Sequence, residues 1–271
     1  MLAKHHDKIL CLLANNFSIN ELLENGIDHV KENYLILKLS GIAKPVEGDL
    51  KFYVGVHKLN KIFIENANNG HLKVVKYLAS QGADIHADND QALQWSAENG
   101  HLEVIKYLIS QGADAYARNN LALRWSAANG HLKVVKFLVS QGADIHADND
   151  WAFRWSVING HLKMVKFLIS QGADIHTDND HALRLGAGNG HLKIVKYLIS
   201  QGADIHAEDD GAFRWSASNG YLEVVKYLIS QGADMHAEDD WALQLSIENN
   251  HPKVTKYLKS IKEKQNANQT P

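Results

Sequence analysis

The sequence lacks several features that would assign the chain to a common functional class. It has a single cysteine, Cys11, among 271 residues, so no intramolecular disulfide can form and a reducing compartment is favoured. The net charge is −3, without the basic excess typical of nucleic-acid-binding proteins. No apolar run approaches the roughly 18 residues of a membrane span, and residues 9–14 are too short and too mixed for a signal peptide. We therefore expect no nucleic acid, no membrane and an intracellular, cytoplasmic location.

Motifs of catalysis and cofactor binding are also missing. The sequence has no nucleophile elbow, no phosphate-binding loop and no dinucleotide-binding glycine pattern. Its Asn-Gly pairs recur at regular intervals, as turns do. We expect no enzymatic activity and no cofactor. The competing hypothesis, an enzyme or enzyme regulator, would require a deep pocket with convergent polar groups.

What the sequence does have is an internal repeat. The string NGHL recurs with its histidine at positions 71, 101, 131, 161 and 191, and Tyr221 and His251 fall on the same 30-residue grid. A fixed period of this length is typical of repeat architectures, in which each unit buries its apolar face against the next.

Each unit predicts two short helices and a loop. In residues 121–150, the second helix carries apolar residues at helical spacing, and Gly142 follows where a left-handed C-terminal cap is expected. The first helix, around residues 122–128, ends at an Asn-Gly turn. The segment ADIHADND, rich in turn formers, is predicted to be an extended loop or hairpin finger.

The consensus of the copies, NGHLKVVKYLISQGADIHA, resembles the second half of the ankyrin repeat, and the match recurs in register over about residues 61–260. The resemblance implies an all-α solenoid of stacked helix-turn-helix units with short finger loops. The unit has 30 residues rather than 33, and only the leucine of the family's Thr-Pro-Leu-His segment survives. The combination of SQGADI and ALRWSA with this period resembles the ankyrin arrays of giant viruses of the Mimivirus type.

The two ends depart from the repeat. Residues 1–60 are predicted to be degenerate N-terminal repeats or a cap, since SINELLENGID at 18–28 and GDLKFYV at 48–54 resemble worn second helices. Residues 61–264 form the array, and residues 265–271 are predicted to be a disordered tail. At the C-terminal end, Lys259 replaces an apolar residue, as a terminal unit with a more polar outer face should.

The copies disagree with one another at two positions, seven residues apart and so on one helical stripe. By resemblance to the family, this stripe lies on the concave face that meets partners. The predicted protein-binding residues on and beside it are Gln91, Trp95, Glu98, Leu121, Trp125, Trp151, Trp155, Ile158, His181, Trp215, Ser218 and Trp241.

Two interpretations of the tryptophans stay open. The regular ones (95, 125, 155 and 215) are explained either by packing between repeats or by contact with a partner. Trp151 and Trp241 favour contact, because sister units carry Gly211 and Gln91 at that position and tryptophan is common in binding hot spots. We hypothesise that Trp151, Trp155 and Ile158 form the most adhesive patch.

Three further series of residues have structural and functional interpretations. Arginines at 124, 154, 184 and 214 either pair with the acidic fingers or leave an acidic rim that steers a basic partner. Histidines at 71–191 and at 86–236 recur once per unit, too far apart to share a metal ion, so we expect no metal site and predict that the first series supports the turns. Gly186 and Gly188 lie inside a first helix, so residues 181–210 are predicted to open most easily.

These patterns together favour a non-enzymatic protein-protein interaction module that binds through the concave helix and finger face. The partner is a protein that the sequence does not identify, a host protein if the chain is viral, and the chain is expected to be a monomer. The alternatives are a target-recruiting adaptor for a ubiquitin ligase, whose recruiting motif could lie only in the degenerate N-terminal segment, and an inert structural array.

Overall fold

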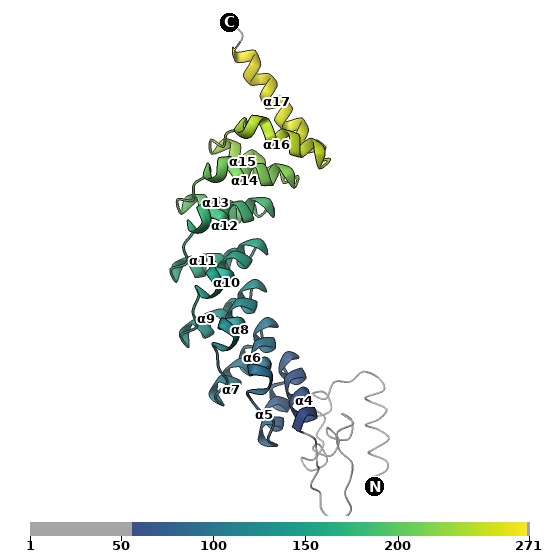
Figure 1. Ribbon diagram of the computed structural model, residues 1–271, viewed down its shortest axis with the longest axis vertical. Coiled ribbons are helices and arrows are strands. Elements are labelled where there is room, and N and C mark those ends of the chain that lie inside the picture. The colour runs from purple at the N-terminus through teal and green to yellow at the C-terminus, as the bar shows by residue number, and fades with distance from the viewer. Residues whose placement is uncertain (1–55, 270–271) are drawn as a thin grey trace, which may run out of the picture. The chain divides into compact units, whose positions relative to one another are not determined.

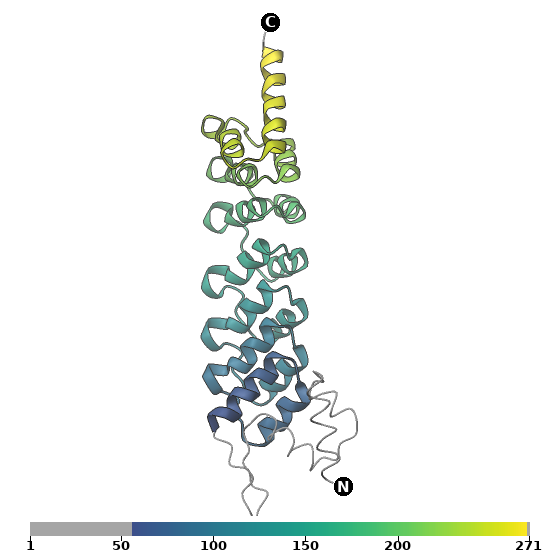
Figure 2. The ribbon, with the colours of Figure 1, turned by 90° about the vertical axis from the view of Figure 1, so that its right-hand side faces the viewer.

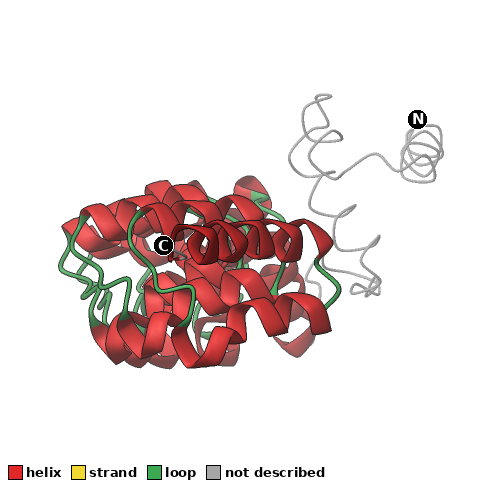
Figure 3. Cartoon of the chain, turned by 90° about the horizontal axis from the view of Figure 1, so that it is seen from above, coloured by secondary structure: helices red, strands yellow, loops and turns green. Residues whose placement is uncertain are grey.

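The computed structural model describes residues 56–269, and the predictions for residues 1–55 and 270–271 lie outside this range. Within it the chain forms helices joined by loops, without a strand (Figure 3). Two compact units are distinguished, Met1–Asp114 and Ala115–Pro271. The predicted all-α class and the two helices per repeat are confirmed.

The first unit contains two described helix pairs, with bounds α4 Val56–Asn68, α5 Leu72–Ser80, α6 Ala87–Glu98 and α7 Leu102–Ser110. The second unit contains five, with bounds α8 Ala117–Ala128, α9 Leu132–Ser140, α10 Ala147–Ile158, α11 Leu162–Ser170, α12 Thr177–Gly188, α13 Leu192–Ser200, α14 Ala207–Ser218, α15 Leu222–Ser230, α16 Ala237–Glu248 and α17 Pro252–Gln269. Within each unit successive pairs lie side by side along the chain (Figures 1 and 2).

The second helices form as the apolar spacing predicts. In α9, Val134, Val135 and Leu138 are buried between the helices. The helix ends at Ser140 and Gly142 follows it, with a φ of 95° in the left-handed region and an amide that donates to the Val139 carbonyl. The predicted glycine cap is therefore confirmed.

The tail differs from its prediction. Helix α17 continues through Gln269, where disorder was expected from residue 265. The segment after Pro252 has no glycine or further proline before residue 271, so nothing local interrupts the helix. The resulting helix is twice as long as α15, with 18 residues against 9.

No helix within residues 56–269 is both long and apolar enough to span a membrane.

Candidate functional site

The finger is a left-handed turn, which corrects the predicted extended loop or hairpin. In the finger at the start of α10, Asp148, Asn149 and Asp150 have φ of 59°, 54° and 55°. The Asp150 amide donates to the His146 carbonyl at 3.2 Å, which closes the turn. Asp and Asn tolerate this conformation better than most residues. The right-handed helix then begins at Trp151. The variable stripe therefore starts at the first residue after the left-handed turn.

One long polar side chain per repeat reaches back to this turn. Arg214 donates from Nε to the Asp209 carbonyl at 2.9 Å and from Nη2 to the Glu208 carbonyl at 2.7 Å. Gln94 and Gln244 make the corresponding bond to Asn89 and Asp239, at 2.6 and 2.9 Å. The main role of the arginine side chain is therefore to donate hydrogen bonds to the carbonyls of the finger just before it. The sequence analysis missed this role.

Pairing between the arginines and the acidic fingers is limited to two contacts in the described part of the second unit. Arg124 Nη1 lies 2.5 Å from Asp148 Oδ2, and Arg214 Nη1 lies 3.7 Å from Glu238 Oε2. Both carboxylates lie in the next finger along the chain, 24 residues after the arginine. Of the two interpretations left open for this series, cross-repeat pairing applies at these two positions.

The finger histidines bind carboxylates four residues later. His86 Nδ1 donates to Asp90 Oδ1 at 3.0 Å, and the same oxygen accepts the Asp114 amide at 3.1 Å. His206 and Asp210 repeat this arrangement at 3.2 Å. A buried carboxylate thus ties one finger to the next. Among residues 56–269, no three metal-ligating side chains are grouped where they could hold an ion.

The histidines of the NGH series support turns, as predicted, but the turn belongs to the preceding repeat. His161 Nε2 donates to the Ala128 carbonyl at 2.8 Å, and His191 Nε2 donates to the Ile158 carbonyl at 2.7 Å. At the first of the series, burial and then the nearby His101 lower the pKa of His71. These side chains are structural.

In the first unit, the predicted stripe borders a groove. Gln91 and Trp95 line a hollow of about 440 Å³ together with Ile64, Asp84 and Asp88. Trp95 is 37% exposed. Glu98 is half-buried and lies outside this lining. Two of the three predicted residues in this unit therefore share one concavity, whose walls combine an indole ring with carboxylates.

In the second unit, three tryptophans meet. The rings of Trp151 and Trp155 are stacked with centroids 5.1 Å apart, and Trp125 from the preceding repeat meets Trp151 edge-on at 5.6 Å. The Arg124 guanidinium lies 5.6 Å from the Trp151 ring. We call Trp125, Trp151 and Trp155 the tryptophan cluster. Ile158 is half-buried on the same helix as Trp151 and Trp155, and the adhesive patch of these three residues stays a prediction.

The other predicted residues are spread along the stripe. His181 meets Trp215 edge-on at 6.2 Å, and burial, followed by Arg184, lowers the pKa of His181. Trp241 is 40% exposed beneath the Arg214 guanidinium, 4.8 Å from the ring. Leu121 is half-buried, and the hydroxyl of Ser218 accepts from Asn249 at 2.9 Å.

The regular tryptophans are partly packed, and their contact with a partner stays a prediction. Trp125, Trp155 and Trp215 keep 38, 39 and 42% of their surface exposed, so packing covers the larger part of each ring and leaves one side accessible. Gly188 explains some of that packing, since a Cβ there would lie 3.1 Å from the Trp215 ring.

The first stripe position is less free than its variability predicts. A Cβ on Gly211 would lie 2.7 Å from Cδ of Arg184, one repeat earlier, and Gly211 is buried. Arg124 and Arg214 cover Trp151 and Trp241 in the same way. The sequence contained a signal for this contact, because an arginine precedes each of these positions by 27 residues.

Comparison with known proteins agrees with this geometry. Residues 63–149 and 146–209 match the family model for ankyrin repeats in three copies, and residues 212–240 match the model for a single ankyrin repeat. The chain belongs to the ankyrin-repeat family. It is also similar to an ankyrin repeat protein of Acanthamoeba polyphaga mimivirus, with 36% identity over 100 residues. That match covers 33% of this chain and 46% of the viral protein, so it spans about half of the relative's length.

Ankyrin repeats are protein-protein interaction modules, and the predicted resemblance to giant-virus arrays is confirmed by this relative.

Proposed function

We propose that the chain is a non-enzymatic module that binds a protein partner through the face formed by its first helices and fingers, here called the helix-finger face. The observation that carries this proposal is the exposure of tryptophan along that face, 38–42% for Trp125, Trp155, Trp215 and Trp241. Tryptophan is enriched in binding hot spots because a large, rigid ring buries much area at little entropic cost. The tryptophan cluster is the strongest candidate for the anchor.

The charges around the tryptophans favour a partner with basic side chains. The tips of the fingers carry exposed carboxylates beside the first helices, and two of them meet an arginine. A basic segment would be steered toward this rim and could stack a cationic side chain on an indole ring. At the finger tips of the second unit, the exposed carboxylates are Asp148, Asp178, Glu208, Asp209, Glu238 and Asp239.

The groove in the first unit supports the same partner chemistry. Its lining includes the carboxylates of Glu65, Asp84 and Asp88 against one cation, Lys61, with Trp95 as an apolar wall. The long stem of a lysine or arginine could lie against Trp95 while its charged end meets a carboxylate.

The decisive experiment compares partner capture by the wild type and by Trp151→Ser with Trp241→Ser. Loss of the captured proteins with unchanged thermal melts would support the proposal. A sharp fall in the melting temperature would assign both tryptophans to the core instead. Tyr227→Ser is the matched control, because Tyr227 is a half-buried aromatic residue on second helix α15. Capture that survives in the double variant would contradict the proposal.

Two further roles depend on partners. An adaptor that recruits targets to a ubiquitin ligase would need a recruiting motif, and the candidate segment in this sequence is residues 1–60, most of which lie outside the described residues. In such a role, or as a scaffold, the chain would act in the cytoplasm, that of the host cell if it is viral, as a monomer. An inert structural array is the outcome expected if no extract yields a partner.

A further inference from the structure

The repeat formed by α16 and α17 leaves an apolar side chain exposed at a position that is buried in the preceding repeats. Ile247 is 51% exposed. The corresponding residues of the four preceding repeats are fully buried, each with 0% exposure: Ala127, Val157, Ala187 and Ala217. The exposed residue is also larger than the alanine that three of these repeats carry. Ile247 therefore offers a partner an apolar contact that the internal repeats satisfy among themselves.

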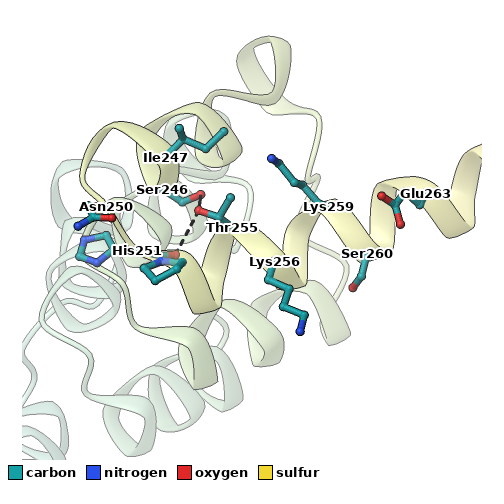
Figure 4. Close-up of a pocket in the computed structure, with 10 residues that line it drawn as sticks. Ser246, Ile247, Asn250, His251, Thr255, Lys256, Lys259, Ser260 and Glu263 are labelled. Atoms are coloured by element: carbon teal, nitrogen blue, oxygen red, sulfur yellow. Dashed lines mark hydrogen bonds between the residues drawn. The ribbon is translucent and has the colours of Figure 1, made fainter.

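A groove of about 580 Å³ surrounds Ile247, between the end of α16 and one side of α17 (Figure 4). At its floor, the Ser246 and Thr255 hydroxyls lie 2.9 Å apart, and the Thr255 hydroxyl donates to the His251 carbonyl at 3.1 Å. These polar groups already bond to one another. The groups of the groove that could contact a ligand are the apolar surface of Ile247 and the charged side chains along the rim.

The rim is more basic than acidic. Lys256 and Lys259 line the groove, with Glu263 as the one carboxylate in its lining. Lys259 stands where the preceding repeat has Ile229, so a cation replaces an apolar residue beside the groove. Lys262, on the same helix, is already bound to Asp240 at 2.5 Å. An apolar centre with a net positive rim matches an apolar side chain flanked by carboxylates.

The internal repeats indicate the kind of element that fits. Over the position corresponding to Ile247 lies the first helix of the next repeat: Ser156 on α10 donates to the Ala127 carbonyl at 3.2 Å. A helix is thus the element that covers this position in the preceding repeats. We propose that the groove binds an acidic amphipathic helix of a protein partner, with its apolar stripe on Ile247 and its carboxylates on Lys256 and Lys259.

A second copy of the chain is a poorer occupant by charge. A symmetric pair of these end faces would bring the lysines of one α17 toward those of the other, since an isologous contact joins the same patch on both copies. The lysine side chains of the two copies would repel one another, because they carry the same charge. The acidic helix removes this repulsion and neutralises the rim.

The test uses two labelled helical peptides with the same leucine stripe, one with glutamate and one with lysine at every polar position. Fluorescence anisotropy measures their binding to the full chain. We expect the glutamate peptide to bind and the lysine peptide not to bind. Ile247→Ala, which installs the alanine of most internal repeats, should weaken binding about tenfold. About half of the isoleucine side chain is exposed, and the peptide would no longer bury that apolar surface. Lys259→Glu should abolish binding of the glutamate peptide.

Lys253→Glu is the matched control, because Lys253 is exposed on α17 and lies outside the lining of the groove. This variant should retain binding in buffer of physiological ionic strength, where distant charges are screened. The Trp151→Ser with Trp241→Ser variant should also bind the glutamate peptide normally, so a failure of the helix-finger face and a failure of this groove are distinguishable.

Three results would overturn the proposal. The first is absence of binding by the glutamate peptide, and the second is equal binding of both peptides. The third is a wild-type dimer in sedimentation equilibrium that Ile247→Ala dissociates, which would make the groove an interface between copies of the chain. Thermal melts of each variant verify that the fold is retained.

Discussion

The imidazole of His161 lies against Gly130, the last residue of the Asn-Gly turn one repeat earlier. A Cβ on Gly130 would lie 2.8 Å from two atoms of the ring, and His161 also donates to the Ala128 carbonyl. The φ of Gly130 is 76°, in the region that favours glycine. Two separate requirements therefore fix this residue: a left-handed backbone and a close approach between repeats.

These requirements predict the effect of Gly130→Ala. The substitution should lower the free energy of unfolding by about 1–2 kcal/mol from the left-handed conformation, and by about 1–3 kcal/mol more from displacement of the histidine ring. Gly172→Ala is the control, because Gly172 has a φ of 106° but a Cβ there would meet nothing within 4 Å. Urea denaturation measures both. Equal losses would show that the new methyl group displaces the His161 ring at no cost in stability.

How much of the fold could be predicted from the sequence depends on how far apart in the chain the interacting residues lie. The second helices, the glycine caps and the period depend on local patterns, and the sequence shows them directly. The left-handed finger did not follow from composition, because Asp and Asn indicate a turn without giving its φ values. The contact of His161 with Gly130 joins residues 31 positions apart and becomes visible only when the repeats are stacked.

The tryptophan stripe shows the same limit at the site itself. Comparing the repeats identified Trp151 and Trp155 as one patch, and the structure stacks their rings. The comparison of the repeats did not identify Trp125 as the third member of the cluster, nor Arg124 as the cation above Trp151, because both residues come from the preceding repeat. Periodicity predicts which residues share a helix face, whereas the angle between neighbouring repeats decides which side chains meet.

The arginine that holds each finger can be tested by exchanging it for the residue used elsewhere in the array. Arg214→Gln should change the free energy of unfolding little, since Gln94 and Gln244 bind the same carbonyl in their own fingers. Arg214→Ala should cost about 1–2 kcal/mol, because two carbonyls lose their donor. Chemical denaturation of the two variants measures the difference in their free energies of unfolding. A glutamine variant as unstable as the alanine variant would show that charge, rather than the bond to the turn, matters.

Residues 181–210 remain the segment that we expect to open first within the described array. Each glycine in a helix costs about 0.5–1 kcal/mol relative to alanine, and α12 has Gly186 and Gly188 within its right-handed part. Native-state hydrogen exchange should show the fastest exchange there among the internal repeats. Protection equal to that of residues 121–150 would contradict this prediction.

Gly186→Ala should reverse that weakness by about 0.5–1 kcal/mol. A Cβ at Gly186 would meet Val157, Ile194 and Val195 at 3.4–3.7 Å, which is ordinary contact. Gly188→Ala is the matched comparison, since its Cβ would lie 3.1 Å from the Trp215 ring and some of the gain should be lost. Thermal melts and hydrogen exchange of both variants measure the difference. Destabilisation by Gly186→Ala would show that the helices around it cannot admit even one methyl group.

The junction of α17 with the finger at the start of α16 should make the array sensitive to acid. Asp240 accepts from Lys262 at 2.5 Å and from His236 at 2.6 Å, and the hydrogen bond from Lys262 is the main cause that lowers the pKa of Asp240. Because this carboxyl binds its proton less readily when folded, its contribution to stability is present above the unfolded pKa near 4 and is lost as pH falls through the folded value. Lys262→Met should raise the pKa of Asp240 in a carboxyl NMR titration and flatten the loss of stability below about pH 4. Lys264→Met, at an exposed position of the same helix, is the control. An unchanged titration of Asp240 in Lys262→Met would show that Lys262 does not hold the finger in solution.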